Sequence, residues 1–222
     1  MGMASSFTAL ADGITIALPK GRILADALAL LKKAGFDGEA LADDSRKLIL
    51  DLPERRARLL LLRNSDIPTY VEYGAADMGI VGKDILQEQL KDVYEPLDLQ
   101  FGACRLVVAR PRDYSRPADA VNWSHIKVAT KYMRLAEEHF SKKGVQVELI
   151  YLGGSVELAP LIGLSDYIVD LVQSGRTLHE NGLVEVEEIM YSTARLVVNR
   201  ASQKTKYEPM MHLVHQLRTY LS

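Results

Sequence analysis

The sequence has few of the features on which several protein classes depend. Only one cysteine, Cys104, occurs among 222 residues, so neither an internal disulfide framework nor a cysteine-based zinc site can form within the chain. No apolar run approaches the length of a membrane span. The first dozen residues have neither the basic region nor the apolar region of a secretory signal peptide. These absences predict a cytoplasmic protein with no membrane partner.

The chain also has no excess of charge of one sign. Its 27 Lys and Arg residues nearly balance 29 Asp and Glu residues, so no overall field draws it to nucleic acid or to a membrane surface. Any anion site must therefore be local. A length of 222 residues with 48% hydrophobic residues is enough for one large α/β domain or two smaller lobes.

Strand-like runs alternate with helical patterns along most of the chain. Residues 14–19 (ITIALP) are typical of a buried strand, and residues 22–35 follow with a helical period that ends at a glycine. A polar linker at 112–125 precedes a second series of the same kind. Repeated alternation predicts an α/β fold with mainly parallel sheets flanked by helices. Two series predict two lobes, with the active site in the cleft between them.

One segment in the second series combines an acid, a glycine and two hydroxyls. Asp170 comes near the end of an apolar run, where open α/β sheets bind their ligands. Four residues later, Ser174-Gly175-Arg176-Thr177 offers hydroxyls and backbone N–H groups at an expected helix start. The segment lacks a Walker lysine and dinucleotide spacing. It suits a ribose phosphate; the alternative is that the hydroxyls only cap a turn and a helix.

The same segment resembles the signature of the ATP phosphoribosyltransferase family. Residues 157–178, ELAPLIGLSDYIVDLVQSGRTL, satisfy ten fixed positions at the required spacing. These positions are Glu157, Gly163, Ser165, Ile168, Asp170, Leu171, Ser174, Gly175, Thr177 and Leu178. The segments ALPKGRI, SRKL, LRNSDIPTYVEYGAADMGIVGKD and KVATKY resemble the family in the expected order, so that the likeness extends from about Ile14 to Asn199.

The resemblance implies a reaction and a fold. Members of this family transfer the phosphoribosyl group of phosphoribosyl pyrophosphate (PRPP) to N1 of the adenine of ATP, release pyrophosphate with Mg²⁺ present, and open histidine biosynthesis. The implied fold is the two-lobed type II fold of periplasmic binding proteins. We assign residues 1–102 and 189–222 to lobe I and residues 103–188 to lobe II. A non-catalytic two-lobed binding module is the alternative, because fold alone does not separate the two.

The resemblance also implies roles for particular residues. The PRPP-binding residues would be Glu157, Asp170, Ser174, Gly175, Arg176 and Thr177. Mg²⁺ would be held through the substrate phosphates, with Asp170 as a candidate protein ligand. Because charge separates as the bond to pyrophosphate breaks, we expect cations near that group, and Arg22 and Arg46 are the two candidate catalytic arginines. The candidate ATP and polyphosphate contacts are Lys20, Gly21, Lys83, Thr130 and Lys131.

The resemblance further implies partners. The chain stops soon after LVVNRAS, as short members of the family do, and such members work with a separate regulatory subunit that resembles histidyl-tRNA synthetase. We therefore expect a hetero-oligomer with that subunit. The final helix carries Met210, Leu213, Val214, Leu217 and Leu221 at helical spacing, and its apolar face predicts a homodimer contact.

Overall fold

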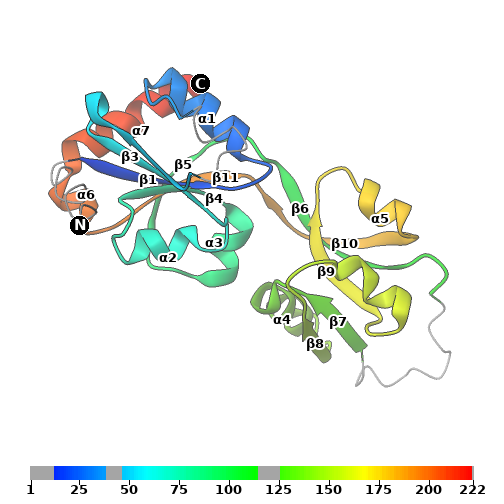
Figure 1. Cartoon of the computed structure of the whole chain (residues 1–222). Helices are drawn as coiled ribbons and strands as arrows, with labels where there is room; N and C mark the ends of the chain where they lie inside the picture. The colour runs from blue at the N-terminus through cyan, green and yellow to red at the C-terminus, as the bar shows by residue number, and fades with distance from the viewer. Residues whose placement is uncertain (1–12, 39–46, 115–125, 222) are drawn as a thin grey trace, which may run out of the picture. The chain divides into compact units, whose positions relative to one another are not determined.

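The chain divides into two compact α/β units in the computed structural model, which describes residues 13–38, 47–114 and 126–221 (Figure 1). The first unit is Met1–Leu86, Leu90–Gly102 and Thr193–Ser222, and the second is Gln87–Gln89 and Ala103–Ser192. The expected division after residue 102 coincides with a unit boundary, whereas that after residue 188 falls inside a continuous strand. The linker at 112–125 separates no units, and its residues from 115 onward lie outside the described ranges.

The first unit contains a six-stranded mixed sheet in the order β2-β3-β1-β4-β11-β5. Its strands are β1 (Ile14–Pro19), β2 (Ile49–Leu52), β3 (Ala57–Leu62), β4 (Met78–Gly82), β5 (Tyr94–Asp98) and β11 (Ala194–Val198). Strand β1 pairs in parallel with β3 and β4, while β2, β11 and β5 join antiparallel. The sheet is therefore mixed rather than mainly parallel, because β2 reaches β3 through a short turn and β11 enters from the other unit.

Helices cover both faces of this sheet (Figure 1). They are α1 (Leu24–Lys33), α2 (Ile67–Glu72), α3 (Lys83–Gln89), α6 (Ser202–Thr205) and α7 (Tyr207–Leu221), with a 3-10 turn η3 at Pro53–Arg55. On one face, α1 and α7 pack against alternate β1 residues such as Ile16 and Leu18. On the other, α2 and α3 pack around Ala17. Alternation along the strand thus divides two hydrophobic cores between the two faces.

A buried ion pair holds the C-terminal segment to the first sheet. The Asp77 side chain is only 5% exposed and accepts hydrogen bonds from the Thr15 backbone N–H at 2.8 Å and from the Lys206 ammonium at 2.9 Å. Lys206 also donates to the Gly13 carbonyl at 2.8 Å. The apolar face predicted for the final helix is buried in this unit, since Met210 and Leu217 belong to its core.

The second unit contains a five-stranded mixed sheet in the order β10-β6-β9-β7-β8. Its strands are β6 (Cys104–Pro111), β7 (Ile126–Thr130), β8 (Val147–Tyr151), β9 (Tyr167–Val172) and β10 (Leu183–Ser192). Strand β7 pairs in parallel with β8 and β9, and β6 and β10 join antiparallel. Cys104 lies buried in β6.

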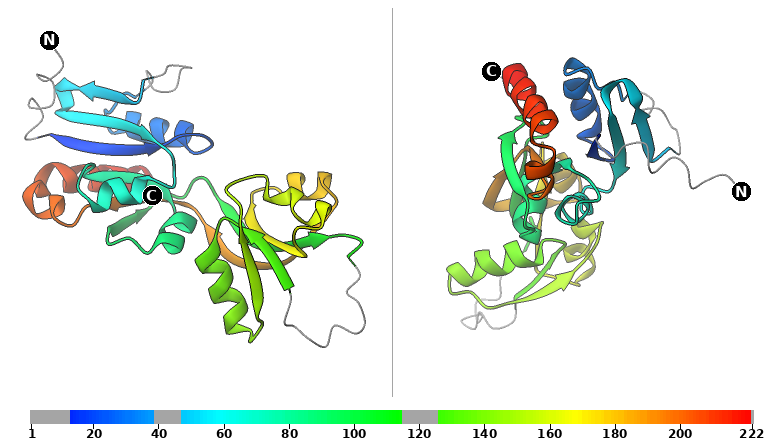
Figure 2. Two further views of the ribbon diagram at one scale, coloured as in Figure 1. Left: turned by 60° about the horizontal axis from the view of Figure 1, so that its bottom comes forward. Right: turned by 90° about the vertical axis from the view of Figure 1, so that its left-hand side faces the viewer.

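The two faces of the second sheet carry different short elements (Figure 2). These elements are α4 (Met133–Lys142), α5 (Arg176–Glu180) and two 3-10 turns, η5 (Val156–Leu158) and η6 (Pro160–Ile162). Leu178 of α5 and Val156 of η5 pack on Ile168 of β9. The sequence pattern predicts a turn and a helix within residues 153–164. Two 3-10 turns form instead, because Pro160 lacks an N–H donor and Gly163 adopts a left-handed conformation with φ of 74°.

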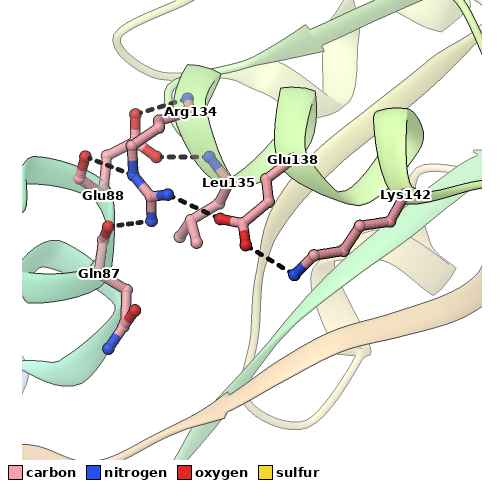
Figure 3. Close-up of polar contacts among 6 residues, drawn as sticks. All are labelled: Gln87, Glu88, Arg134, Leu135, Glu138 and Lys142. Carbon is pink, nitrogen blue, oxygen red and sulfur yellow. Dashed lines mark hydrogen bonds and ion pairs between the residues drawn. The ribbon is translucent and has the colours of Figure 1, made fainter.

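The last turn of α3 belongs to the second unit and is joined to α4 by reciprocal capping (Figure 3). The Glu88 carboxylate accepts the backbone N–H groups of Arg134 and Leu135, both at 3.0 Å, at the start of α4. The Arg134 guanidinium in turn donates to the carbonyls of Gln87 and Glu88 at the end of α3. The end of α3 therefore supplies acceptors for the free N–H groups at the start of α4, and Arg134 of α4 supplies donors for the free carbonyls at the end of α3. Within the described ranges, every helix is too short or too polar to span a membrane.

Candidate functional site

The acid of the signature lies at the carboxyl end of two neighbouring parallel strands in the second unit. Strands β7 and β9 pair with Thr130 opposite Val169, so the residues that follow in each chain segment emerge at the same edge of the sheet. Asp170 is the next residue of β9, and Lys131 directly follows β7. The structure therefore brings together two residues that are 39 positions apart in the sequence. Open α/β sheets bind their ligands at this edge.

The Asp170 carboxyl has an unusual electrostatic environment. Burial raises its pKa above the ordinary value for an aspartate, and the nearby charge of Glu157 adds to this increase. The Leu171 backbone N–H and the Lys131 ammonium act in the opposite direction. One other acid and one lysine, from two other segments of the chain, therefore influence this carboxyl. A shifted carboxyl at the end of a sheet is typical of a functional site, although ion pairs in a purely structural role also shift pKa values.

The hydroxyl-bearing loop follows two residues after β9. Gly175 adopts a left-handed conformation with φ of 76°, and α5 begins at Arg176. The side chains of Ser174 and Thr177 are exposed, and the Ser174 hydroxyl oxygen accepts a long, weak hydrogen bond of 3.5 Å from the Arg176 backbone N–H. Among the described residues, the backbone N–H groups of Gly175, Thr177 and Leu178 have no acceptor. Three donors and two hydroxyls are thus available to an anion.

Arg176 is turned along its own helix. Its guanidinium lies 3.5 Å from the Glu180 carboxylate, and its side chain is 82% exposed. Its predicted contact with a phosphate stays a prediction. The loop also borders a groove of about 520 Å³. The groove is lined by Ser174, Gly175, Arg176, Leu178, His179, Glu180, Leu183, Val184 and Glu185.

Thr130 has its hydroxyl engaged within the fold. The hydroxyl donates to the Val169 carbonyl at 2.7 Å and accepts the Tyr132 backbone N–H at 2.9 Å. The residue is completely buried. Its predicted contact with an ATP phosphate is therefore not favoured by this geometry, whereas a role in joining β7 to β9 is directly visible. The neighbouring Lys131 ammonium lies 4.9 Å from the centre of the Tyr132 ring and remains partly exposed.

The first unit places its candidate residues at the equivalent edge of its own sheet. Lys20, Gly21 and Arg22 form the turn that follows β1, and Lys83 follows the neighbouring parallel strand β4. Gly21 needs its glycine, since its φ is 90°. Lys20 and Arg22 are exposed, and the Arg22 guanidinium makes a long contact of 3.4 Å with the Gly102 carbonyl.

Two other candidate cations, Lys83 and Arg46, are not visible as free cations at this edge. The Lys83 ammonium already pairs with Glu95 at 2.7 Å, so a phosphate contact would have to compete with this ion pair. Arg46 lies outside the described residues, and its catalytic role stays a prediction. The structure places Lys20, Gly21 and Lys83 at the sheet edge of the first unit where ligands bind.

Two mixed α/β units with polar residues beyond the ends of their parallel strands define the class: a two-unit α/β protein built to bind a small polar ligand. The sequence model of the family described as ATP phosphoribosyltransferase (HisG) matches residues 63–219. The chain belongs to this family. The activity that follows is phosphoribosyl transfer to ATP, the first step of histidine biosynthesis, and the enzyme is a pentosyltransferase.

Individual relatives agree with the family assignment. An ATP phosphoribosyltransferase of Citrifermentans bemidjiense is 55% identical over 210 residues, which cover 95% of this chain and 99% of the relative. A solved ATP phosphoribosyl transferase (HisG:HisZ) complex from Thermotoga maritima has a chain that is 32% identical, with a TM-score of 0.80, covering 94% of this chain and 98% of that one.

A more distant structure bears on the fold alone. The substrate binding protein of an amino acid ABC transporter has a TM-score of 0.55 at 17% identity and covers 93% of both chains. This likeness confirms the predicted type II binding-protein fold. It carries no information on the ligand, because unrelated functions share this architecture.

Sequence reasoning missed two features near the loop. Lys131 was assigned to ATP, yet the structure places its charge within range of Asp170, the acid assigned to PRPP. The second feature is an ion pair between Arg105 of β6 and Glu185 of β10. Neither residue belongs to the signature, and 80 positions separate them. A basic residue within the apolar run CRLVVARP was the one available signal.

Proposed function

We propose that this chain transfers the phosphoribosyl group of PRPP to N1 of the adenine of ATP, and that the second unit binds PRPP. The ribose 5-phosphate is held by residues 174–177, and the ribose hydroxyls by Asp170 and Glu157. One observation carries this placement: the signature acid Asp170 shares its surroundings with Glu157 and Lys131 at a sheet edge, four residues before a loop with unpaired N–H donors.

The loop supports phosphate binding through its free donors. The exposed hydroxyls of Ser174 and Thr177 each precede a free N–H group along the chain, those of Gly175 and Leu178. Hydrogen bonds from such donors to a charged phosphate oxygen are shorter and stronger than hydrogen bonds between neutral groups. Helix α5 has only five residues, so its dipole contributes little and the individual donors dominate. Arg176 is available to the phosphate if it leaves Glu180, an exposed partner that holds it weakly.

The charges near the ribose suit the expected course of the reaction. Breaking the bond from ribose C1 to pyrophosphate places positive charge on the sugar ring and negative charge on the leaving group. The carboxylates of Asp170 and Glu157 would stabilise the positive charge on the sugar ring. The cations Arg22, Arg46 and Lys131 would stabilise the negative charge on the departing pyrophosphate. The attacking adenine nitrogen is already unprotonated at neutral pH. The chain therefore needs no strong general base for this step.

Mg²⁺ fits this site as an ion that binds together with the substrate phosphates rather than as an ion held by the protein alone. Among the described residues, no group of three or more His, Cys, Asp or Glu side chains could hold a metal ion. Mg²⁺ is commonly bound by one or two carboxylates together with substrate phosphates, and Asp170 with Glu157 would supply them. When bound, the ion neutralises pyrophosphate charge.

The ATP side is assigned to the first unit, with Lys131 of the second. Lys20, Gly21 and Lys83 follow adjacent parallel strands, and two of them are exposed, which supports contact with a polyphosphate. Thr130 contributes by fixing the strand end rather than by touching ATP. The use of ATP as a substrate supports a cytoplasmic location.

A regulatory partner belongs to the same proposal. The solved relative from Thermotoga maritima is a HisG:HisZ complex, which supports a hetero-oligomer of this chain with a separate regulatory subunit. The predicted homodimer contact loses its ground, because the apolar face of the final helix is buried within the first unit. Nucleic acid and membranes are not expected partners, since the formal net charge is −2. The purified chain should then be insensitive to histidine until the partner is added. Inhibition of the chain alone by histidine would contradict this.

The activity is tested by mixing the chain with ATP, PRPP and Mg²⁺ and following the ultraviolet absorbance of an adenine-modified product. The site is tested by Thr177→Ala, which should raise KM for PRPP and leave KM for ATP unchanged. A matched control is Ser165→Ala, because Ser165 belongs to the same signature but its buried hydroxyl has no partner among the described residues. Equal effects of both variants would contradict the assignment of the loop.

A further inference from the structure

An acidic strand lies beside the loop that is proposed to bind a phosphate. Strand β10 carries Glu185, Glu187 and Glu188 within four positions. An ideal Cβ built on Gly175 would lie 3.2 Å from a carboxylate oxygen of Glu185, and Glu185 lines the same groove as Ser174 and Gly175. A bare carboxylate in this place would repel a dianion. The fold must therefore compensate this charge if the loop holds a phosphate.

Arg105 supplies the compensation from the neighbouring strand. Its guanidinium donates two hydrogen bonds to the Glu185 carboxylate, at 2.8 and 3.1 Å, and approaches Glu188 at 3.5 Å. Glu185 raises the pKa of Arg105 above its ordinary value. The planar fork matches a carboxylate better than a lysine does. Glu187 has different partners, Lys143 and His139.

The strand geometry explains why one arginine serves two acids. Irregularities in the pairing of β10 with β6 occur between Glu185 and Glu187 and again after Glu188. Such bulges change the direction of side chains along a strand. Arg105 itself lies opposite Val172 of β9, two residues before the loop. The ion pair therefore spans the base of the loop from β6 to β10.

We propose that Arg105 is a positioning residue for PRPP: its guanidinium neutralises and fixes the Glu185 carboxylate against Gly175, so that a dianionic phosphate can bind at the loop. This inference rests on the proposed placement of the 5-phosphate at residues 174–177. Arg105 acts through Glu185 and does not itself touch the substrate. It is thus a determinant of PRPP affinity rather than a catalytic group.

The test is steady-state kinetics with PRPP and ATP varied separately. Arg105→Ala should raise KM for PRPP about tenfold at low salt, because one unpaired carboxylate then faces a dianion, while kcat and KM for ATP change less than about twofold. The difference should shrink as salt screens the exposed charges. Arg105→Lys should keep most of the affinity. Lys127→Ala removes a cation from an exposed pair in the same unit and should have no effect.

The double variant separates electrostatics from simple damage to the fold. Arg105→Ala with Glu185→Gln removes both charges and should restore most of the PRPP affinity. Glu185→Gln alone removes the acid that faces Gly175 and leaves Arg105 with Glu188 as its remaining acidic partner, so that it should lower KM for PRPP. This single variant decides the matter even if Arg105→Ala fails to fold: a raised KM for PRPP in Glu185→Gln would overturn the proposal.

Two other results bear on different parts of the argument. An unchanged KM for PRPP in Arg105→Ala, when Thr177→Ala raises it, would overturn the role of Arg105 and leave the phosphate site standing. Equal increases in both KM values that the double variant does not reverse would show that Arg105 is only structural. An inactive wild-type chain, or no effect of Thr177→Ala, would instead contradict the proposed function.

Discussion

Asp170→Asn should weaken substrate binding and stabilise the free protein at the same time. The substitution keeps the shape of the side chain and an oxygen for the Leu171 backbone N–H, but it removes the charge. Burial and the charge of Glu157 raise the pKa of Asp170, which means that the ionised form is disfavoured in the folded chain. Removing that ionised group at neutral pH therefore removes an unfavourable contribution to the free energy of folding. The same change removes the acceptor proposed for the ribose hydroxyls.

The size of the functional effect follows from the hydrogen bond that is weakened. A hydrogen bond to a charged group is worth about 1.5–3 kcal/mol, and a tenfold change in affinity corresponds to about 1.4 kcal/mol. We therefore expect KM for PRPP to rise about 10- to 100-fold. The KM for ATP should stay close to that of the wild type. The absorbance assay for the adenine-modified product measures both.

The effect on stability has a defined sign and pH window. A carboxyl whose pKa is raised on folding contributes stability below its unfolded pKa, and this contribution is lost as the pH rises through the folded pKa. Asp170→Asn should thus raise the midpoint of thermal unfolding at neutral pH, and the difference should vanish in acid. Unchanged PRPP affinity would refute the assignment of Asp170. A variant that is both weaker in binding and less stable would refute the electrostatic reasoning.

The remaining predictions concern other residues of both units. Asp77→Ala should lower the free energy of unfolding by about 3 kcal/mol, since it leaves the Lys206 ammonium without its buried partner; urea unfolding measures this, and a loss below about 1 kcal/mol would contradict it. Glu88→Ala uncaps α4 and should cost about 1 kcal/mol by the same assay, and an unchanged midpoint would count against the reciprocal cap. Arg22→Ala should lower kcat more than it raises KM for PRPP; a change confined to KM would remove its catalytic role.

Elements with a clear period could be predicted from the sequence. The strand at 14–19 is confirmed as β1, and the helix expected at 22–35 occurs as α1 at Leu24–Lys33, because apolar residues recur at the spacing of each element. A turn and a helix were predicted within residues 153–164, and the helix was wrong, since Pro160 and Gly163 favour the two short 3-10 turns that form there. The antiparallel strands of both sheets were not predicted as such. Strand direction depends on distant pairing partners, which hydrophobic spacing does not encode.

Some features of the candidate site could likewise be predicted from the sequence, and others could not. The signature located Asp170 and the loop because their spacing is local. The proximity of Lys131 to Asp170 depends on the register of β7 against β9. The pairing of Arg105 with Glu185 depends on how β10 is paired with β6, including two register shifts along β10. Both are products of sheet assembly, so that no pattern within a short segment carries them.

The electrostatics of Asp170 support a binding role independently of the signature. A largely buried carboxyl beside Glu157, which among the described residues is opposed by Lys131 and one backbone N–H, destabilises the folded chain when it is ionised. An asparagine would fit the same strand without this cost, so stability alone gives no reason for an aspartate there. Ligands with hydroxyl donors or an accompanying cation would relieve the unfavourable charge when they bind. The ionised carboxyl therefore raises the free energy of the ligand-free protein. Binding of a polyhydroxylated, Mg²⁺-associated substrate is favoured because it removes this cost.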